Sequence, residues 1–139
     1  MRALGPESNI VAVHDAARPL FDPGIFSKAY PLLEIHDGVI AALPAAYTMK
    51  KVRGIIVEKT LAREELWQAN TPQIFHRRFL EDAYRKAAET GFYGTDDAML
   101  VEALGGSVAV IPDTPHNIKI TTMSDLFTAE QILLHEEEG

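Results

Sequence analysis

Short runs of apolar residues indicate where buried strands lie. Ile10–Val13 is entirely apolar and ends at once in a polar cluster, which is typical of a strand covered on both faces. Residues 39–43 form a second run, closed by Pro44, and residues 107–111, which are apolar after Ser107, form a third. Each of these runs predicts one strand of a buried sheet.

Helical spacing and capping residues predict helices between and after these strands. Asp22 and Pro23 form the expected N-cap and first residue of a helix that continues to about residue 36. Apolar residues recur at helical spacing after residue 75 and up to Gly91. Thr95 is the expected cap of a helix through residue 104, and Ser124 caps a last helix to about residue 135.

Residues 48–60 follow a different pattern. Two short stretches, residues 49–52 and 55–60, flank Arg53-Gly54, which predicts two strands around a tight turn. The sequence on either side supplies few partners for such a hairpin. We therefore expect the hairpin to project as an arm.

Strands that alternate with helices predict one α/β domain with a mostly parallel sheet. In open sheets of this kind, ligands bind beyond the carboxyl ends of the strands. The polar cluster 14–18 follows the first strand directly, and another loop follows residue 111. These two loops are the first place to seek a functional site.

Composition narrows the range of partners. The formal net charge of −7 disfavours a nucleic-acid partner, and the lack of cysteine excludes disulfides and thiolate chemistry. No apolar stretch approaches the roughly 20 residues that span a bilayer, and the N-terminus does not resemble a signal peptide. We expect a soluble, cytoplasmic protein that binds neither nucleic acid nor membrane.

Common catalytic motifs are missing from the sequence. It contains no GxxxxGK[ST] phosphate loop, no His-x-x-x-His pair and no Gly-x-Ser-x-Gly segment. Asp15 and Arg18, three residues apart in a loop after a strand, are the first candidate pair. The carboxylate could hold Mg²⁺ or a sugar hydroxyl and the guanidinium a phosphate. A plain salt bridge that pins the loop is the commoner interpretation of such spacing.

Three further residues are weaker candidates for an anion site. Thr71 and Thr95 carry hydroxyls, and a hydroxyl beside the N-terminal amides of a helix can bind an anion. Lys119 lies between Ile118 and Ile120, a pattern more often found on the solvent face of a half-buried strand. Arg63 and the Lys50-Lys51 pair are expected to be ordinary surface residues on the same reasoning.

Four segments, in this order, resemble the signature segments of the 2-C-methyl-D-erythritol 4-phosphate cytidylyltransferase family. Residues 13–19 read VHDAARP, residues 66–75 LWQANTPQIF, residues 95–102 TDDAMLVE and residues 117–130 NIKITTMSDLFTAE. From the first to the last they span residues 13–130, which is nearly the whole chain.

The resemblance implies a Rossmann-like fold of the nucleotide-diphospho-sugar transferase type. It also implies transfer of the cytidylyl group from CTP to methylerythritol phosphate, with release of pyrophosphate, in non-mevalonate isoprenoid biosynthesis. The segment that grips CTP in this family would lie upstream of Met1. We therefore expect residues 1–139 to form a partial domain that binds the acceptor and dimerises, with negligible turnover by itself.

The resemblance also assigns residues to roles. Asp15, with Mg²⁺ as cofactor, Arg18 and Lys119 are the implied catalytic residues. The implied contacts to the acceptor are Thr48, Arg63, Thr71, Thr95 and Lys119. Residues 47–63 would form a homodimerisation arm that reaches the partner's site.

Two other functions remain open at this point. The acceptor could be a different polyol phosphate, such as ribitol phosphate, because relatives that use it share the fold and part of the first segment. Alternatively, the chain could be a non-catalytic dimerisation module. Binding of methylerythritol phosphate would contradict this last alternative, because a purely structural module has no reason to hold that ligand.

Overall fold

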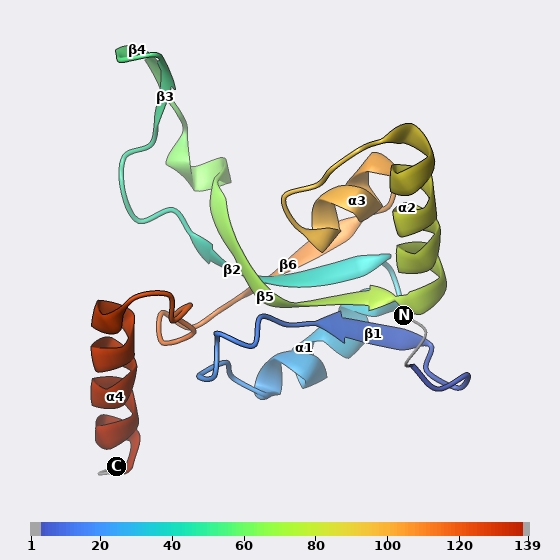
Figure 1. The fold of residues 1–139 in the computed structure, drawn as a ribbon, viewed down its shortest axis with the longest axis horizontal. Coiled ribbons are helices and arrows are strands. Elements are labelled where there is room, and N and C mark those ends of the chain that lie inside the picture. The colour runs from blue at the N-terminus through green and yellow to red at the C-terminus, as the bar shows by residue number, and fades with distance from the viewer. Residues whose placement is uncertain (1–3, 138–139) are drawn as a thin grey trace.

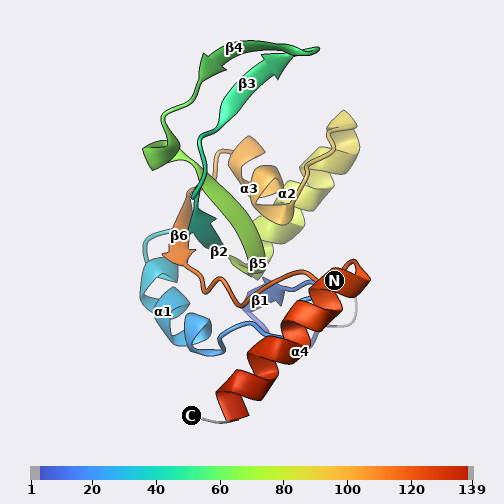
Figure 2. The ribbon, with the colours of Figure 1, turned by 90° about the vertical axis from the view of Figure 1, so that its left-hand side faces the viewer.

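The computed structural model describes residues 4–137. In that range a mixed sheet lies between α1 on one face and α2 with α3 on the other, while a hairpin and the last helix extend away from it (Figures 1 and 2). The elements in chain order are β1 (Ile10–Val13), α1 (Gly24–Leu33), β2 (Gly38–Pro44), β3 (Lys50–Arg53), β4 (Ile56–Thr60), a 3₁₀ turn (Arg63–Glu65), β5 (Trp67–His76), α2 (Arg77–Thr90), α3 (Asp97–Ala103), β6 (Val108–Pro112) and α4 (Met123–Glu137).

The α/β class predicted from the alternating elements is confirmed. The strand order is β1-β5-β2-β6, and β5 runs antiparallel to both of its neighbours whereas β2 and β6 are parallel. β1, β2 and β6 therefore share one direction, as predicted. β5 alone runs against them, so the sheet is mixed.

β5 is the strand that the apolar pattern did not predict. Polar residues at 70, 71 and 73 and Pro72 interrupt the alternation that marks a strand. Proline has no N–H to offer a sheet, and the pairing of β2 with β5 shifts register between Ile40 and Ala42, next to this segment. The irregularity lets a polar stretch pass through the middle of a sheet.

Two apolar clusters hold the helices to the sheet. On one face Phe75, Leu80 and Val101 pack together with α2 and α3, and on the other Ile74 packs with Leu33 of α1. Successive residues of β5 thus serve opposite faces, as the pleat of a strand requires. Leu80 is 1% exposed and belongs to the first cluster.

The helix caps differ from those predicted. Asp96, not Thr95, caps α3, because its Oδ1 accepts the Met99 N–H at 2.9 Å. α4 begins after Thr122 rather than at Ser124: the Thr122 hydroxyl accepts the Asp125 N–H, and the Asp125 carboxylate accepts the Thr122 N–H. This reciprocal pair is a capping box.

The Asp125 carboxylate also accepts the N–H and hydroxyl of Thr121. The bonds from the Thr121 backbone, followed by those from Thr122, lower the pKa of Asp125 to about 2. The loop before α4 is therefore tied to the first turn of the helix.

No helix within residues 4–137 is both long enough and apolar enough to cross a membrane.

The hairpin β3–β4 is present and projects, as predicted (Figure 1). Its strands pair with each other and with no other strand among the described residues. Arg53 pairs with Ile56, which places the turn at Gly54-Ile55, one residue later than expected, with Gly54 at φ +60°. Every residue of both strands is exposed.

We expect Leu80→Ala to lower the free energy of unfolding by about 2–5 kcal/mol, because it removes a fully buried side chain from the cluster between α2 and the sheet. Leu133→Ala on α4 is the matched control, since Leu133 is 47% exposed and should lose far less. Urea denaturation measures both changes. Equal losses would contradict a core centred on the sheet.

Candidate functional site

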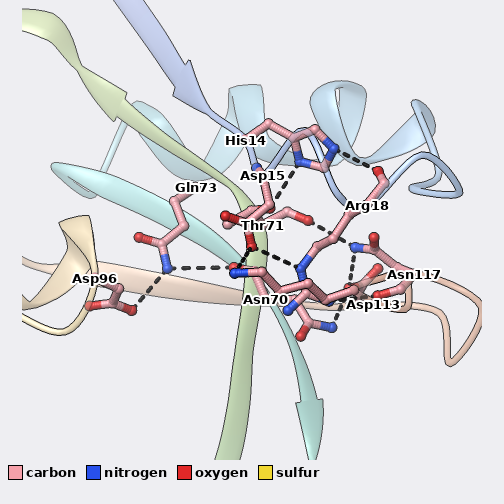
Figure 3. Close-up of polar contacts among 10 residues, drawn as sticks. His14, Asp15, Arg18, Asn70, Thr71, Gln73, Asp96, Asp113 and Asn117 are labelled. Carbon is pink, nitrogen blue, oxygen red and sulfur yellow. Dashed lines mark hydrogen bonds and ion pairs between the residues drawn. The ribbon is translucent and has the colours of Figure 1, made fainter. Parts of the chain in front are cut away.

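Charged residues from two loops meet beyond the carboxyl ends of β1 and β6, where ligands were expected. The loop after β1 carries Asp15 and Arg18, and the loop after β6 carries Lys119. Asp15 Oδ2 lies 3.3 Å from Arg18 Nε and 3.1 Å from Lys119 Nζ. The three charges, with Thr71 of β5 beside Asp15, form what we call the ionic centre. Figure 3 shows Asp15, Arg18 and Thr71 of this centre.

The side chains of the ionic centre differ in exposure. Arg18 is 11% exposed, Asp15 33% and Lys119 48%. The bond from Lys119 is the main cause of a lowered pKa at Asp15; burial opposes it and Arg18 adds to it. One carboxylate between two cations leaves a net positive centre, which suits a phosphate ligand.

Lys119 differs from the prediction in its local structure. It lies in an irregular loop, not in a half-buried strand, so the alternation of Ile118 and Ile120 around it was a misleading signal. The local salt bridge proposed for Asp15 and Arg18 does form. Lys119, more than a hundred residues later in the sequence, also pairs with Asp15. The spacing of residues within one loop could not predict this third partner.

The Arg18 guanidinium is held from a second side. Its Nη1 donates to the Asn117 carbonyl at 2.7 Å, while its Nε faces Asp15. Thr71 Oγ1 accepts the Asp15 backbone N–H at 3.0 Å. The loop after β1 is therefore anchored at two points. Its backbone is held to β5 through Asp15, and the Arg18 side chain is held to the loop after β6.

A cluster of amides that the sequence reasoning missed lies beneath the ionic centre (Figure 3). Asn117 Nδ2 donates to the Thr71 carbonyl at 2.8 Å and to Asp113 Oδ2 at 2.7 Å, and Asn70 Nδ2 donates to the same Asp113 oxygen. Asn70 and Asn117 are each 2% exposed. Their Oδ1 atoms have no partner among the described residues. The cluster fixes the loop that carries Lys119 against β5.

Gln73 connects β5 to α3. Its Nε2 donates to Asp96 Oδ2 at 2.9 Å and its Oε1 accepts the Ala98 N–H at 3.0 Å. Gln73 is 2% exposed. The sequence did carry a signal for this contact, because Gln73 is a polar residue beside the apolar residues of a strand. Buried polar groups are almost always hydrogen-bonded, so such a residue indicates a partner elsewhere in the fold.

Thr95 adjoins this connection but not the ionic centre. Its side chain is exposed, and both its N–H and its hydroxyl lie against Met99 Sδ. It is the neighbouring Asp96 that bonds to Gln73 of β5. The structure thus brings Asp15, Arg18, Thr71 and Lys119 together and leaves Thr95 at the edge.

Thr48 and Arg63 lie at the base of the arm. Thr48 is exposed in the loop between β2 and β3. Arg63 Nη1 donates to the Ala46 carbonyl at 3.3 Å, and Arg63 Nε lies 3.9 Å from Glu64. Within residues 4–137, the hydrogen bonds and ion pairs found for Arg63 are with residues at the base of the arm. Arg63 therefore does not reach the ionic centre of its own chain.

The ionic centre has a single carboxylate, which cannot build a metal cage by itself. No group of three or more aspartates, glutamates or histidines placed to hold a metal occurs among the described residues. Asp15 is the one carboxylate of the centre, and its Oδ2 already contacts both cations. Any metal here would take most of its ligands from elsewhere.

Comparison with known proteins identifies what the chain is similar to. The family model described as 2-C-methyl-D-erythritol 4-phosphate cytidylyltransferase matches residues 1–135. A curated protein of that name from Syntrophus aciditrophicus is 43% identical over 138 residues, which cover 99% of this chain and 59% of that protein. One from Clostridioides difficile is 39% identical over 137 residues, covering 99% and 58%.

Solved structures agree with these relatives. The 4-diphosphocytidyl-2C-methyl-D-erythritol synthase of Anaerococcus prevotii superposes with a TM-score of 0.88 at 32% identity, covering 96% of this chain and 60% of that one. The 2-C-methyl-D-erythritol 4-phosphate cytidylyltransferase of Francisella tularensis superposes with a TM-score of 0.82 at 34% identity, covering 94% and 63%. The chain spans about three fifths of the length of the relatives it matches.

We expect Lys119→Gln to raise the pKa of Asp15 toward the ordinary carboxyl value of about 3.9, because the bond from Lys119 is the largest cause of its lowering. An NMR titration of the carboxyl carbon measures this. Since the folded pKa is the lowered one, the stability that Asp15 contributes is complete above about pH 3.9 and is lost as the pH falls through the folded pKa.

Lys28→Gln is the matched control for this titration. Lys28 is an exposed lysine of α1 that pairs with Asp22. Its removal should leave the titration of Asp15 unchanged. An Asp15 pKa that stays the same in Lys119→Gln would contradict the ionic centre as described.

Proposed function

Because this chain belongs to the 2-C-methyl-D-erythritol 4-phosphate cytidylyltransferase family, we propose that it carries the acceptor-binding and dimerisation part of an enzyme that transfers the cytidylyl group of CTP to methylerythritol phosphate. The observation that carries the proposal is the meeting of Arg18 and Lys119 at Asp15. Their positions are those that the family resemblance assigns to the reaction. The product belongs to isoprenoid biosynthesis, and a chain without cysteine suits the cytoplasm.

The proposed reaction is a displacement at phosphorus. An oxygen of the acceptor phosphate forms a bond to the α-phosphorus of CTP, and the bond from the α-phosphorus to the bridging oxygen breaks, which releases pyrophosphate. A phosphate oxygen is already ionised at neutral pH, so the reaction needs no general base. The protein must instead hold two anions together in line.

Arg18 and Lys119 are suited to hold the acceptor phosphate. Arg18 is mostly buried and braced between Asp15 and the Asn117 carbonyl, so its orientation is fixed before a ligand arrives. Lys119 is half exposed and can swing its ammonium toward a ligand. Thr71 and Thr95 complete the set of proposed acceptor contacts on this chain.

Mg²⁺ is proposed as the metal of the reaction, with Asp15 as its protein ligand. Mg²⁺ commonly binds through one or two carboxylates, with phosphate oxygens and water as the other ligands. A single available carboxylate is consistent with that chemistry and not with a cage built from protein alone. The ion would supply neutralising charge on the triphosphate.

We also propose that the arm makes a homodimer and brings Thr48 and Arg63 to the partner's acceptor site. Both strands of the arm are exposed throughout, and Ile55 and Ile56 at its tip are 93% and 67% exposed. An isolated two-stranded hairpin is marginally stable in water. A partner surface would cover these side chains and stabilise the arm.

Calorimetric titration of the chain with methylerythritol phosphate tests the acceptor site. We expect saturable binding, tighter than that of ribitol phosphate or inorganic phosphate, and a loss of roughly tenfold in affinity for Lys119→Gln, because a charge-assisted hydrogen bond is removed. Lys28→Gln should bind as the unchanged chain does.

Each other result of that titration has a definite meaning. Tighter binding of ribitol phosphate would assign the second acceptor. Binding of neither acceptor would contradict the proposal and favour a non-catalytic dimerisation module. Equal affinity for inorganic phosphate would show that the polyol part is not recognised.

We expect Ile56→Asp in the arm to shift the protein from dimer toward monomer, because it places a charge within the proposed interface. Ile35→Asp is the control, since Ile35 is similarly exposed at 77% but lies between α1 and β2. Sedimentation velocity over a range of concentrations measures both. A dimer unaffected by Ile56→Asp would contradict assembly through the arm.

A further inference from the structure

The ring of His14 is held in one orientation beside the ionic centre. His14 Nε2 lies 2.9 Å from the Arg18 carbonyl oxygen, and Nδ1 lies 3.0 Å from Thr71 Oγ1 (Figure 3). The ring also packs against Phe21, with ring centroids 4.5 Å apart. Both of its nitrogens are therefore engaged, one by the loop after β1 and the other by β5.

These partners determine which nitrogen carries the proton. A carbonyl oxygen can only accept a hydrogen bond, so Nε2 is the donor to the Arg18 carbonyl. In a neutral imidazole the other nitrogen is then an acceptor. The Thr71 hydroxyl consequently donates its proton to His14 Nδ1.

The orientation of the Thr71 hydroxyl has a consequence for Asp15. With its proton directed at His14, the Thr71 oxygen presents lone pairs, and one of them accepts the Asp15 N–H at 3.0 Å. A continuous series of hydrogen bonds thus runs from the Arg18 carbonyl through His14 and Thr71 to the Asp15 backbone. It closes around the loop that contributes Asp15 and Arg18 to the ionic centre.

We propose that His14 is a positioning residue of the acceptor site, which orients the Thr71 hydroxyl and through it fixes Asp15. While His14 holds that proton, Thr71 can accept a hydrogen bond from a ligand hydroxyl but has none to donate to a phosphate. Within the ionic centre the phosphate is left to Arg18 and Lys119. The ligand part of this inference rests on the proposed function; the hydrogen-bond series does not.

Two amide variants separate the two contacts of the ring. In His14→Asn the carboxamide oxygen falls near the position of Nδ1, where it can accept the Thr71 hydroxyl. In His14→Gln the longer side chain reaches the position of Nε2 and can donate to the Arg18 carbonyl. Both variants carry a carboxamide and differ in side-chain length. Length therefore decides which of the two contacts survives.

Hydrogen exchange of the Asp15 amide and titration with methylerythritol phosphate are the measurements. We expect His14→Gln to lose protection at Asp15 and to weaken acceptor affinity roughly fivefold to tenfold, because one hydrogen bond of the series is gone. His14→Asn should retain protection and stay within about threefold of the unchanged chain. Exchange of the α2 amides reports whether both variants remain folded.

Nitrogen NMR of the His14 ring in mildly alkaline buffer, where imidazoles are neutral, gives a readout that needs no ligand. A proton on Nε2 alone is expected. A proton on Nδ1, or equal effects of the two variants on Asp15, would overturn the inference and leave His14 as a residue that only packs against Phe21. If the acceptor does not bind but Asp15 exchange separates the variants, the proposed function fails and the positioning role stands.

Discussion

Polar side chains in the middle of a sheet must find hydrogen-bond partners, and β5 carries three of them in four residues. Asn70, Thr71 and Gln73 pass through the region where the sheet meets its loops. An unpaired amide N–H in such a place would cost roughly 1–3 kcal/mol. The N–H groups of Asn70 and Gln73 instead bond to Asp113 and Asp96, so segments far apart in the chain are drawn to one strand.

The ionic centre depends on this convergence. Arg18 and Lys119 are like charges that would separate in water, and Asp15 between them lowers the cost of holding both in one place. An anionic ligand would then meet cations that are already assembled. The overall charge of −7 does not oppose such binding, because attraction at a few ångströms outweighs distant charges that salt screens.

The arm has a different relation to the fold. It contributes nothing to the two apolar clusters, and its strands contact water on both faces. A segment of this kind is retained at a cost in stability unless another surface covers it. Arg63 at its base lies outside the ionic centre of its own chain, so binding of an acceptor and assembly of two chains are physically linked if Arg63 serves the partner.

The sequence by itself determined the α/β class, the helices and the projecting hairpin, because apolar spacing, glycines and local turns depend on near neighbours. Its four motif segments also pointed to Asp15, Arg18 and Lys119 through the family resemblance. Only the tertiary structure decided that β5 is an antiparallel strand, that Lys119 stands in a loop against Asp15, and that His14 connects Thr71 to the Arg18 carbonyl. The physical reason is that polar groups are satisfied by whichever partner the fold brings near, and some of those partners lie more than a hundred residues away in the sequence.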